Sequence, residues 1–194
     1  MIVDSIEDIA ATLKYLQSRK ALLVPIFSSP TLHASINSLC AIYIYTEDDI
    51  ERLIPIRHVE QISGFPEHVS AFLELENIFV HDKKQWLQIG GNRAVLDVKT
   101  LWWYTYNEAY DEGHYPTATH QFYWRRHQNL NHVNGIVPLQ KHLEMCQKIR
   151  HYAWPMCINA EQTQSYLQFN SIYPETFAEI ENVGLQVNDT FRMP

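Results

Sequence analysis

The sequence predicts an α/β fold in which helices flank a mixed sheet. Three short apolar runs follow one another at 21–27, 38–46 and 52–58, with the length and composition of buried strands. Two further runs, at 77–80 and 93–97, alternate with helical patterns, which is the order of βαβ units. We therefore expect three antiparallel strands, then parallel strands, and a helical C-terminal third.

The first element is expected to be a helix over about residues 5–19. Ser5 and Asp8 form a capping pair, and apolar residues then recur on one helical face. The acidic segment 46–51 is expected to form the turn between the second and third strands.

From Phe65 onward the spacing of the apolar residues changes to one typical of helices. Pro66 is expected to begin a helix that ends near Asn77. A second helix is expected over 81–91, closed by glycine, and a Trp-rich helix from about residue 98. Three more helices are predicted at about 117–129, 136–152 and 160–182, with Pro155 separating the last two.

Composition indicates one domain spanning residues 1–194. The 194 residues are 46% hydrophobic and 19% charged, enough to bury a sizeable core. A formal charge of −7 argues against nucleic-acid binding by the whole surface. The three cysteines form no metal-binding pair, and neither a signal peptide nor a membrane-spanning run is seen. We expect a soluble cytoplasmic protein.

Four stretches together resemble the 3′–5′ exonuclease domain of family A (DNA polymerase I-like) DNA polymerases, which has a ribonuclease-H-like fold. These stretches are the strands within 21–58, NIFVHDKKQWLQIGG at 77–91, VLDVKTL at 95–101, and IYPETFAEIENVGLQVN at 172–188. In the last stretch Glu181, Gly184, Val187 and Asn188 are in register with the family. The helix at about 160–189 resembles the junction between exonuclease and polymerase.

The resemblance implies a site that has lost its metal ligands. Such exonucleases hold two divalent metals with four carboxylates. The matching positions in this chain are Pro25, Phe27, a position at or near Trp86, and one near Asn134. None of these side chains supplies an anionic oxygen, so the resemblance implies neither catalytic residues nor a metal cofactor.

Two aspartates lie close to these positions in the sequence. Asp97 matches a family position that is not a metal ligand, and Asp82 is placed to cap a helix. We expect both to be structural. The alternative is an active nuclease that uses a displaced set of carboxylates, Asp82, Asp97, Asp111 and Glu112.

One basic and aromatic cluster, FYWRRH at 122–127, is a candidate single-strand platform. Phe122, Tyr123 and Trp124 would stack on bases while Arg125 and Arg126 contact phosphates. The alternative is that the aromatic rings are buried against the sheet and the arginines are solvated.

The histidines are not expected to bind metal. Four of them lie close together in the sequence but none is spaced i, i+4 on a helix: His114, His120, His127 and His132. Three others are expected to hydrogen-bond the backbone in loops or at strand ends: His33, His58 and His81.

The leading interpretation is a catalytically inactive exonuclease-like module that supports or docks on a DNA polymerase or other replication protein. Single-stranded DNA is a further candidate partner, and a membrane is not. The aromatic segment 100–124 is the expected partner surface. Two alternatives remain, an active divalent-metal-dependent 3′–5′ exonuclease and a non-enzymatic protein-binding module that reuses the fold.

Overall fold

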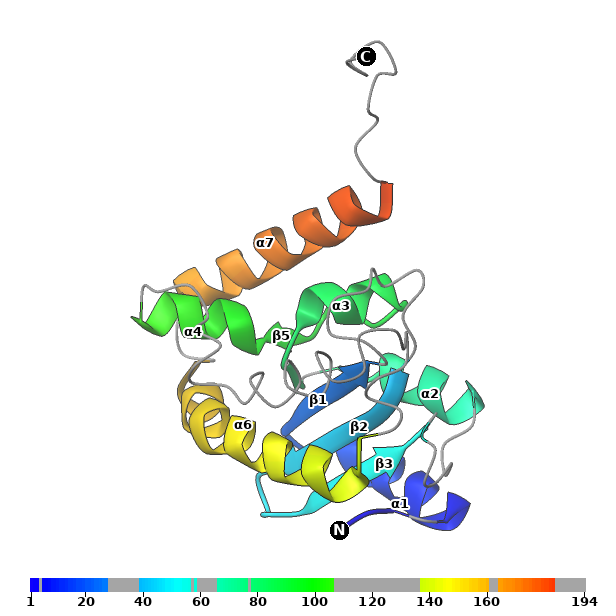
Figure 1. The fold of residues 1–194 in the computed structure, drawn as a ribbon. Helices are drawn as coiled ribbons and strands as arrows, with labels where there is room; N and C mark the ends of the chain where they lie inside the picture. The colour runs from blue at the N-terminus through cyan, green and yellow to red at the C-terminus, as the bar shows by residue number, and fades with distance from the viewer. Residues whose placement is uncertain are drawn as a thin grey trace, which may run out of the picture.

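A computed structural model describes most of the chain, in eight segments: 1–3, 5–27, 39–56, 58, 66–76, 78–106, 137–160 and 164–183. Its strands are β1 (Ala21–Phe27), β2 (Leu39–Thr46), β3 (Glu51–Pro55), β4 (Phe79–Val80) and β5 (Leu96–Asp97). Its helices are α1 (Ile6–Leu16), α2 (Pro66–Leu73), α3 (Lys83–Gln88), α4 (Val98–Tyr106), α6 (Leu139–Ala160) and α7 (Gln164–Val183). Figure 1 shows their arrangement.

The five strands form one mixed sheet in the order β3-β2-β1-β4-β5. β1 pairs antiparallel with β2, and β2 pairs antiparallel with β3. β4 runs parallel to both β1 and β5. This topology confirms the expected mixed sheet, with the antiparallel strands first in the chain and the parallel strands after them.

Local signals explain where α1 begins and where the β1–β4 pairing ends. The Asp8 amide donates to the Ser5 side chain at 3.1 Å, which confirms the predicted cap of α1. The His81 amide donates to the Leu23 carbonyl at 2.9 Å. The next bond of a parallel ladder would need an N–H at residue 25, and Pro25 has none, so the pairing stops there.

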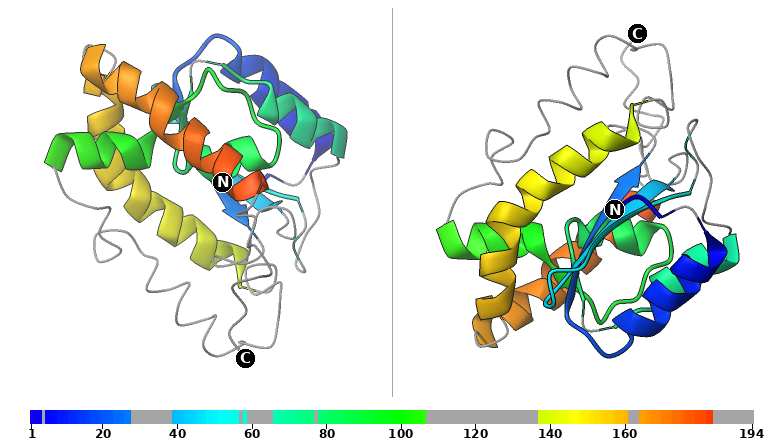
Figure 2. Two further views of the ribbon diagram at one scale, coloured as in Figure 1. Left: turned by 90° about the horizontal axis from the view of Figure 1, so that it is seen from above. Right: turned by 90° about the horizontal axis from the view of Figure 1, so that it is seen from below.

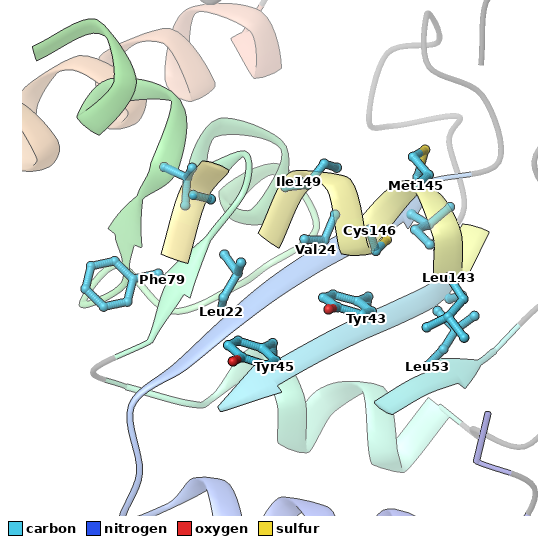
Figure 3. Close-up of a cluster of buried hydrophobic side chains, with 14 of the residues drawn as sticks. Leu22, Val24, Tyr43, Tyr45, Leu53, Phe79, Leu143, Met145, Cys146 and Ile149 are labelled. Atoms are coloured by element: carbon cyan, nitrogen blue, oxygen red, sulfur yellow. The ribbon is translucent and has the colours of Figure 1, made fainter. Parts of the chain in front are cut away.

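Alternate residues of the strands fill two apolar clusters, one on each face of the sheet. Leu22 and Val24 point to the face covered by α4 and α6, where they meet Cys146 and Ile149 (Figure 3). Residues of the opposite parity pack against α1, α2 and α3, which cover the other face. Figure 2 shows α1 and α6 on opposite sides of the sheet.

The structure corrects the prediction about Pro155. α6 continues through this residue and ends at Ala160, so Pro155 does not separate the last two helices. The proline lies on the exposed side of the helix, while Ala153 and Cys157 on either side of it are buried. Packing of these residues against the sheet therefore outweighs the hydrogen bond that Pro155 cannot donate.

Other boundaries are shorter than expected. β3 ends at Pro55 rather than 58, and β4 and β5 have two residues each. The helix predicted at 117–129 lies outside the described residues. Within the described ranges, no helix combines the length and apolar character needed to cross a membrane.

Candidate functional site

The carboxyl end of β1 carries the first two positions that resemble metal-ligand positions. Phe27 is buried and belongs to the cluster on the α1–α2–α3 face. Pro25 is also buried, and strand alternation places it on the same face as Phe27. The β1 side of the candidate site is therefore apolar.

Trp86 of α3 belongs to the same buried cluster as Phe27, with 0% of its surface exposed. Its indole Nε1 is buried and makes no hydrogen bond within the described structure. Three positions matched by the resemblance thus share one face of the sheet, and the fourth, Asn134, lies outside the described residues. None of these three described side chains supplies a carboxylate to this face.

Asp82 is buried at the N-terminus of α3. Its side chain caps the helix by accepting from the Gln85 amide at 3.0 Å, which confirms the predicted cap. It also accepts from Lys99 Nζ at 2.5 Å. Burial alone would raise the pKa of Asp82, but Lys99 and the cap bond lower it below its ordinary value.

Asp97 is buried at the junction of β5 and α4. Its carboxylate accepts from the Lys83 amide at 2.8 Å, from the Thr100 amide at 2.7 Å and from the Thr100 hydroxyl at 2.6 Å. Burial, and secondarily the nearby Asp82 carboxylate, raises the pKa of Asp97 to about 6. Asp97 therefore ties the start of α3 to the start of α4.

These two aspartates are engaged as structural hydrogen-bond acceptors. Among the described residues, no group of three or more His, Cys, Asp and Glu side chains is arranged to hold a metal ion. Asp111 and Glu112, the other members of the displaced carboxylate set, lie outside the described residues.

A buried lysine, which the sequence did not single out, lies next to Asp97. Lys83 is 1% exposed, and its Nζ donates to the Asn170 carbonyl of α7 at 3.1 Å. It also pairs with the Glu175 carboxylate of α7 at 3.3 Å. Burial lowers the pKa of Lys83, and the Glu175 carboxylate opposes that shift.

Asn170 and Arg93 complete this set of contacts between α7 and the body of the domain. The Asn170 side chain accepts from the Asp97 amide at 2.6 Å and donates to the Val95 carbonyl at 3.1 Å. Arg93 pairs with Glu175 and with Glu179, each at 3.3 Å. We call Lys83, Arg93, Asp97, Asn170 and Glu175 the α7 polar cluster. The α7 members of this cluster lie more than seventy residues along the chain from the residues that they contact, so no local pattern could have revealed these contacts.

Most of the other predicted binding residues lie outside the described part of the chain. The proposed single-strand platform, Phe122, Tyr123, Trp124, Arg125 and Arg126, lies outside the described residues. The four clustered histidines do as well. His58 is described, and its Nε2 lies 2.7 Å from the Val137 carbonyl, which confirms a structural role for that histidine.

Known proteins resemble this chain in structure but not in sequence. No family model and no curated protein matches the sequence. A solved structure of the POL domain of Pol1 from M. smegmatis, in complex with DNA primer-template and dNTP, matches 96% of this chain with a TM-score of 0.59 and 16% identity. The chain has a ribonuclease-H-like, exonuclease-type fold. It spans 32% of the length of that Pol1 chain.

Two further solved structures match the chain. Escherichia coli RNase D, an exoribonuclease involved in structured RNA processing, matches 95% of this chain and 51% of its own, with 10% identity and a TM-score of 0.48. The Aedes aegypti Nibbler EXO domain matches 93% of this chain and 94% of its own, with 12% identity and a TM-score of 0.47.

Proposed function

We propose that this chain is a catalytically inactive 3′–5′ exonuclease-like module, a single domain that supports or docks on a DNA polymerase or another replication protein. The observation that carries the proposal is the burial of Phe27 and Trp86 in one apolar cluster, with Pro25 on the same face of the sheet. By the sequence resemblance, Pro25, Phe27 and a position at or near Trp86 match metal-binding carboxylates of the exonucleases.

The physical reason is the chemistry of the metals. Magnesium and manganese need oxygen ligands, and two such ions close together need several negative charges around them. Pro25, Phe27 and Trp86 offer no oxygen from their side chains. Asp82 and Asp97, the two aspartates that the displaced-site alternative would use from the described residues, already bond to Lys99, to the start of α3 and to the start of α4. Recruiting them to a metal would require those contacts to break.

A polymerase is the partner that the comparisons favour. The matched Pol1 chain is longer than this one, so the same fold occurs there as part of a larger protein that binds primer-template DNA. We propose that the present chain serves a polymerase in a comparable supporting role, with α7 on the polymerase side.

A binding module without a replication partner is the second candidate, and one observation favours it. Four large apolar side chains of α7 face solvent, and the Tyr173 and Phe177 rings lie 4.8 Å apart between centroids. Exposed apolar rows of this kind often bind proteins. These residues are Ile172, Tyr173, Phe177 and Ile180.

The enzymatic part of the proposal is tested with 5′-labelled single-stranded DNA. The purified chain is incubated with magnesium or manganese, and product lengths are resolved on a gel. We expect no shortening from the 3′ end. Metal-dependent shortening that is abolished by Asp82→Asn or Asp97→Asn would establish the displaced-site nuclease instead.

The identity of the lost site is tested by restoring carboxylates. The variant Phe27→Glu with Trp86→Asp is compared with Ile42→Glu with Ile44→Asp, which places two acids on the same face of the sheet but in β2. We expect both to melt below the wild type, and manganese to raise the melting temperature of the first variant only. An equal response of both variants to manganese would contradict the assignment.

The docking part is tested by binding, separately from nuclease activity. We propose to measure binding of the purified chain to a family A DNA polymerase fragment by biolayer interferometry, after nuclease treatment to remove DNA bridging. Saturable binding supports the proposal. No binding to the polymerase, together with stable capture of a partner outside replication, supports the second candidate.

A further inference from the structure

Asn170 of α7 hydrogen-bonds the outer edge of β5 as a neighbouring strand would. Its side-chain amide accepts from the Asp97 amide and donates to the Val95 carbonyl, the two backbone groups on either side of Leu96. A residue in a parallel strand makes the same pair of bonds. On the opposite side of β5, the Leu96 amide donates to the Ile78 carbonyl at 2.9 Å. The side chain of Asn170 therefore extends the sheet by one peptide-like group.

Two described glutamates of α7 make further polar contacts with the body. Glu175 pairs with the buried Lys83 and with the exposed Arg93, and Glu179 pairs with Arg93 alone. Ion pairs that include an exposed arginine are screened by salt and contribute little. The Lys83 ammonium is held where burial disfavours its charge, and it would regain hydration if α7 moved away.

Among the described side chains of α7, the apolar ones that pack inward are small. Neither apolar cluster of the sheet contains a described α7 residue. Pro174 and Ala178, both small, are buried on the inner side of α7. The large apolar side chains described for α7 face solvent. Figure 1 shows α7 as an outer layer over α3 and α4.

We propose that α7 is a releasable cover of the β5 edge, which detaches as a unit while the sheet and the helices packed on it stay folded. Detachment replaces the Asn170 hydrogen bonds with bonds to water, an exchange that costs little compared with opening the apolar clusters. It exposes the Val95 carbonyl and the Asp97 amide at the edge of the sheet. The inference is independent of whether the chain binds a polymerase.

Two adjacent backbone amides provide the test. The Asp97 amide donates to α7, whereas the Leu96 amide donates within the sheet. Native-state hydrogen exchange measured by NMR at low denaturant should show the Asp97 and α7 amides opening at least about tenfold more often than the Leu96 amide. Raising sodium chloride should widen this ratio, because the Arg93 pairs are screened.

A matched pair of variants locates the cause. Glu175→Gln removes the carboxylate that faces Lys83, whereas Glu179→Gln removes only a pair with Arg93. We expect Glu175→Gln to speed exchange of the Asp97 and α7 amides by about tenfold or more and to leave Leu96 unchanged. Glu179→Gln should change these rates by less than about threefold.

One outcome overturns the proposal. If the Asp97, Leu96 and α7 amides exchange with a single opening free energy in the wild type, and shift together in Glu175→Gln, then α7 unfolds only with the whole domain and is not releasable. If Glu175→Gln does not fold, the proposal is still tested, because the exchange rates of the Asp97 and Leu96 amides are compared in the wild type.

Discussion

A side chain at Gly91 would place its Cβ 2.2 Å from the Cδ1 atom of Trp86. The Gly91 amide also donates to the Trp86 carbonyl at 2.9 Å. The buried indole of Trp86 therefore needs a glycine beside it. The turn after α3 and the apolar filling of the candidate site depend on each other.

This contact predicts that Gly91→Ala destabilises the fold more than Gly90→Ala. The first substitution drives a methyl group into a buried ring, at a cost of about 2 kcal/mol or more. Gly90 has a φ of 88° but open space around its Cβ position, so alanine there costs only about 1 kcal/mol of backbone strain. Urea unfolding of both variants measures the difference. Equal losses would show that the Trp86 ring moves aside freely.

The raised pKa of Asp97 predicts a pH-dependent stability. A carboxyl with a higher pKa in the folded protein stabilises the fold when protonated. For Asp97 that contribution is complete below its ordinary pKa of 3.8 and is lost as the pH rises to about 6. Relative to Asp97→Asn, which does not titrate, wild-type stability should fall across this interval by up to roughly 3 kcal/mol.

Urea unfolding of the two proteins at intervals between pH 3.5 and 7, roughly spanning the titration, measures this difference. Asp97→Asn also loses a hydrogen bond to Thr100, which lowers the free energy of unfolding by the same amount at every pH. The pKa of Asp82 is lowered, so its own contribution is lost only as the pH falls below its ordinary range. If the difference in unfolding free energy between the two proteins does not change from pH 4 to 6, the prediction is wrong.

The cap formed by Asp82 predicts different effects of two substitutions. Asp82→Ala removes the acceptor for the Gln85 amide and should cost about 1–2 kcal/mol. Asp82→Asn keeps that acceptor and should cost less than about 1 kcal/mol, because the partly exposed Lys99 can be rehydrated. Thermal unfolding monitored by circular dichroism distinguishes them. If the two variants have the same melting temperature, the ion pair with Lys99 contributes more to stability than the helix cap does.

Pro155 within α6 predicts a gain in stability on substitution. Pro155→Ala restores an N–H for the His151 carbonyl at an exposed position of the helix, and should stabilise the protein by about 1–2 kcal/mol. Pro174→Ala in α7 is the control, because Pro174 is buried and its removal also loses apolar contact. Differential scanning calorimetry measures both changes. A lower melting temperature for Pro155→Ala would show that the ring relieves strain in α6.

The elements that the sequence predicted well are those whose signals are local. The apolar run at 21–27 matches β1 in both bounds, because a strand buried on both faces needs an unbroken apolar segment. Ser5 and Asp82 were predicted as caps for a similar reason, since a cap depends on residues within three positions. The sequence did not predict that α6 continues through Pro155. A proline ends a helix only where tertiary packing does not compensate for the hydrogen bond that it cannot donate.

The sequence by itself determined the mixed sheet, its flanking helices and the absence of carboxylates at Pro25, Phe27 and Trp86. Only the tertiary structure decided that Phe27 and Trp86 share one apolar cluster, that Asp82 and Asp97 are held by structural hydrogen bonds, and that Asn170 completes the edge of β5. The physical reason is the range of each effect. Backbone conformation follows from neighbouring residues, whereas burial, pKa and hydrogen-bond pairing depend on side chains brought together from distant parts of the chain.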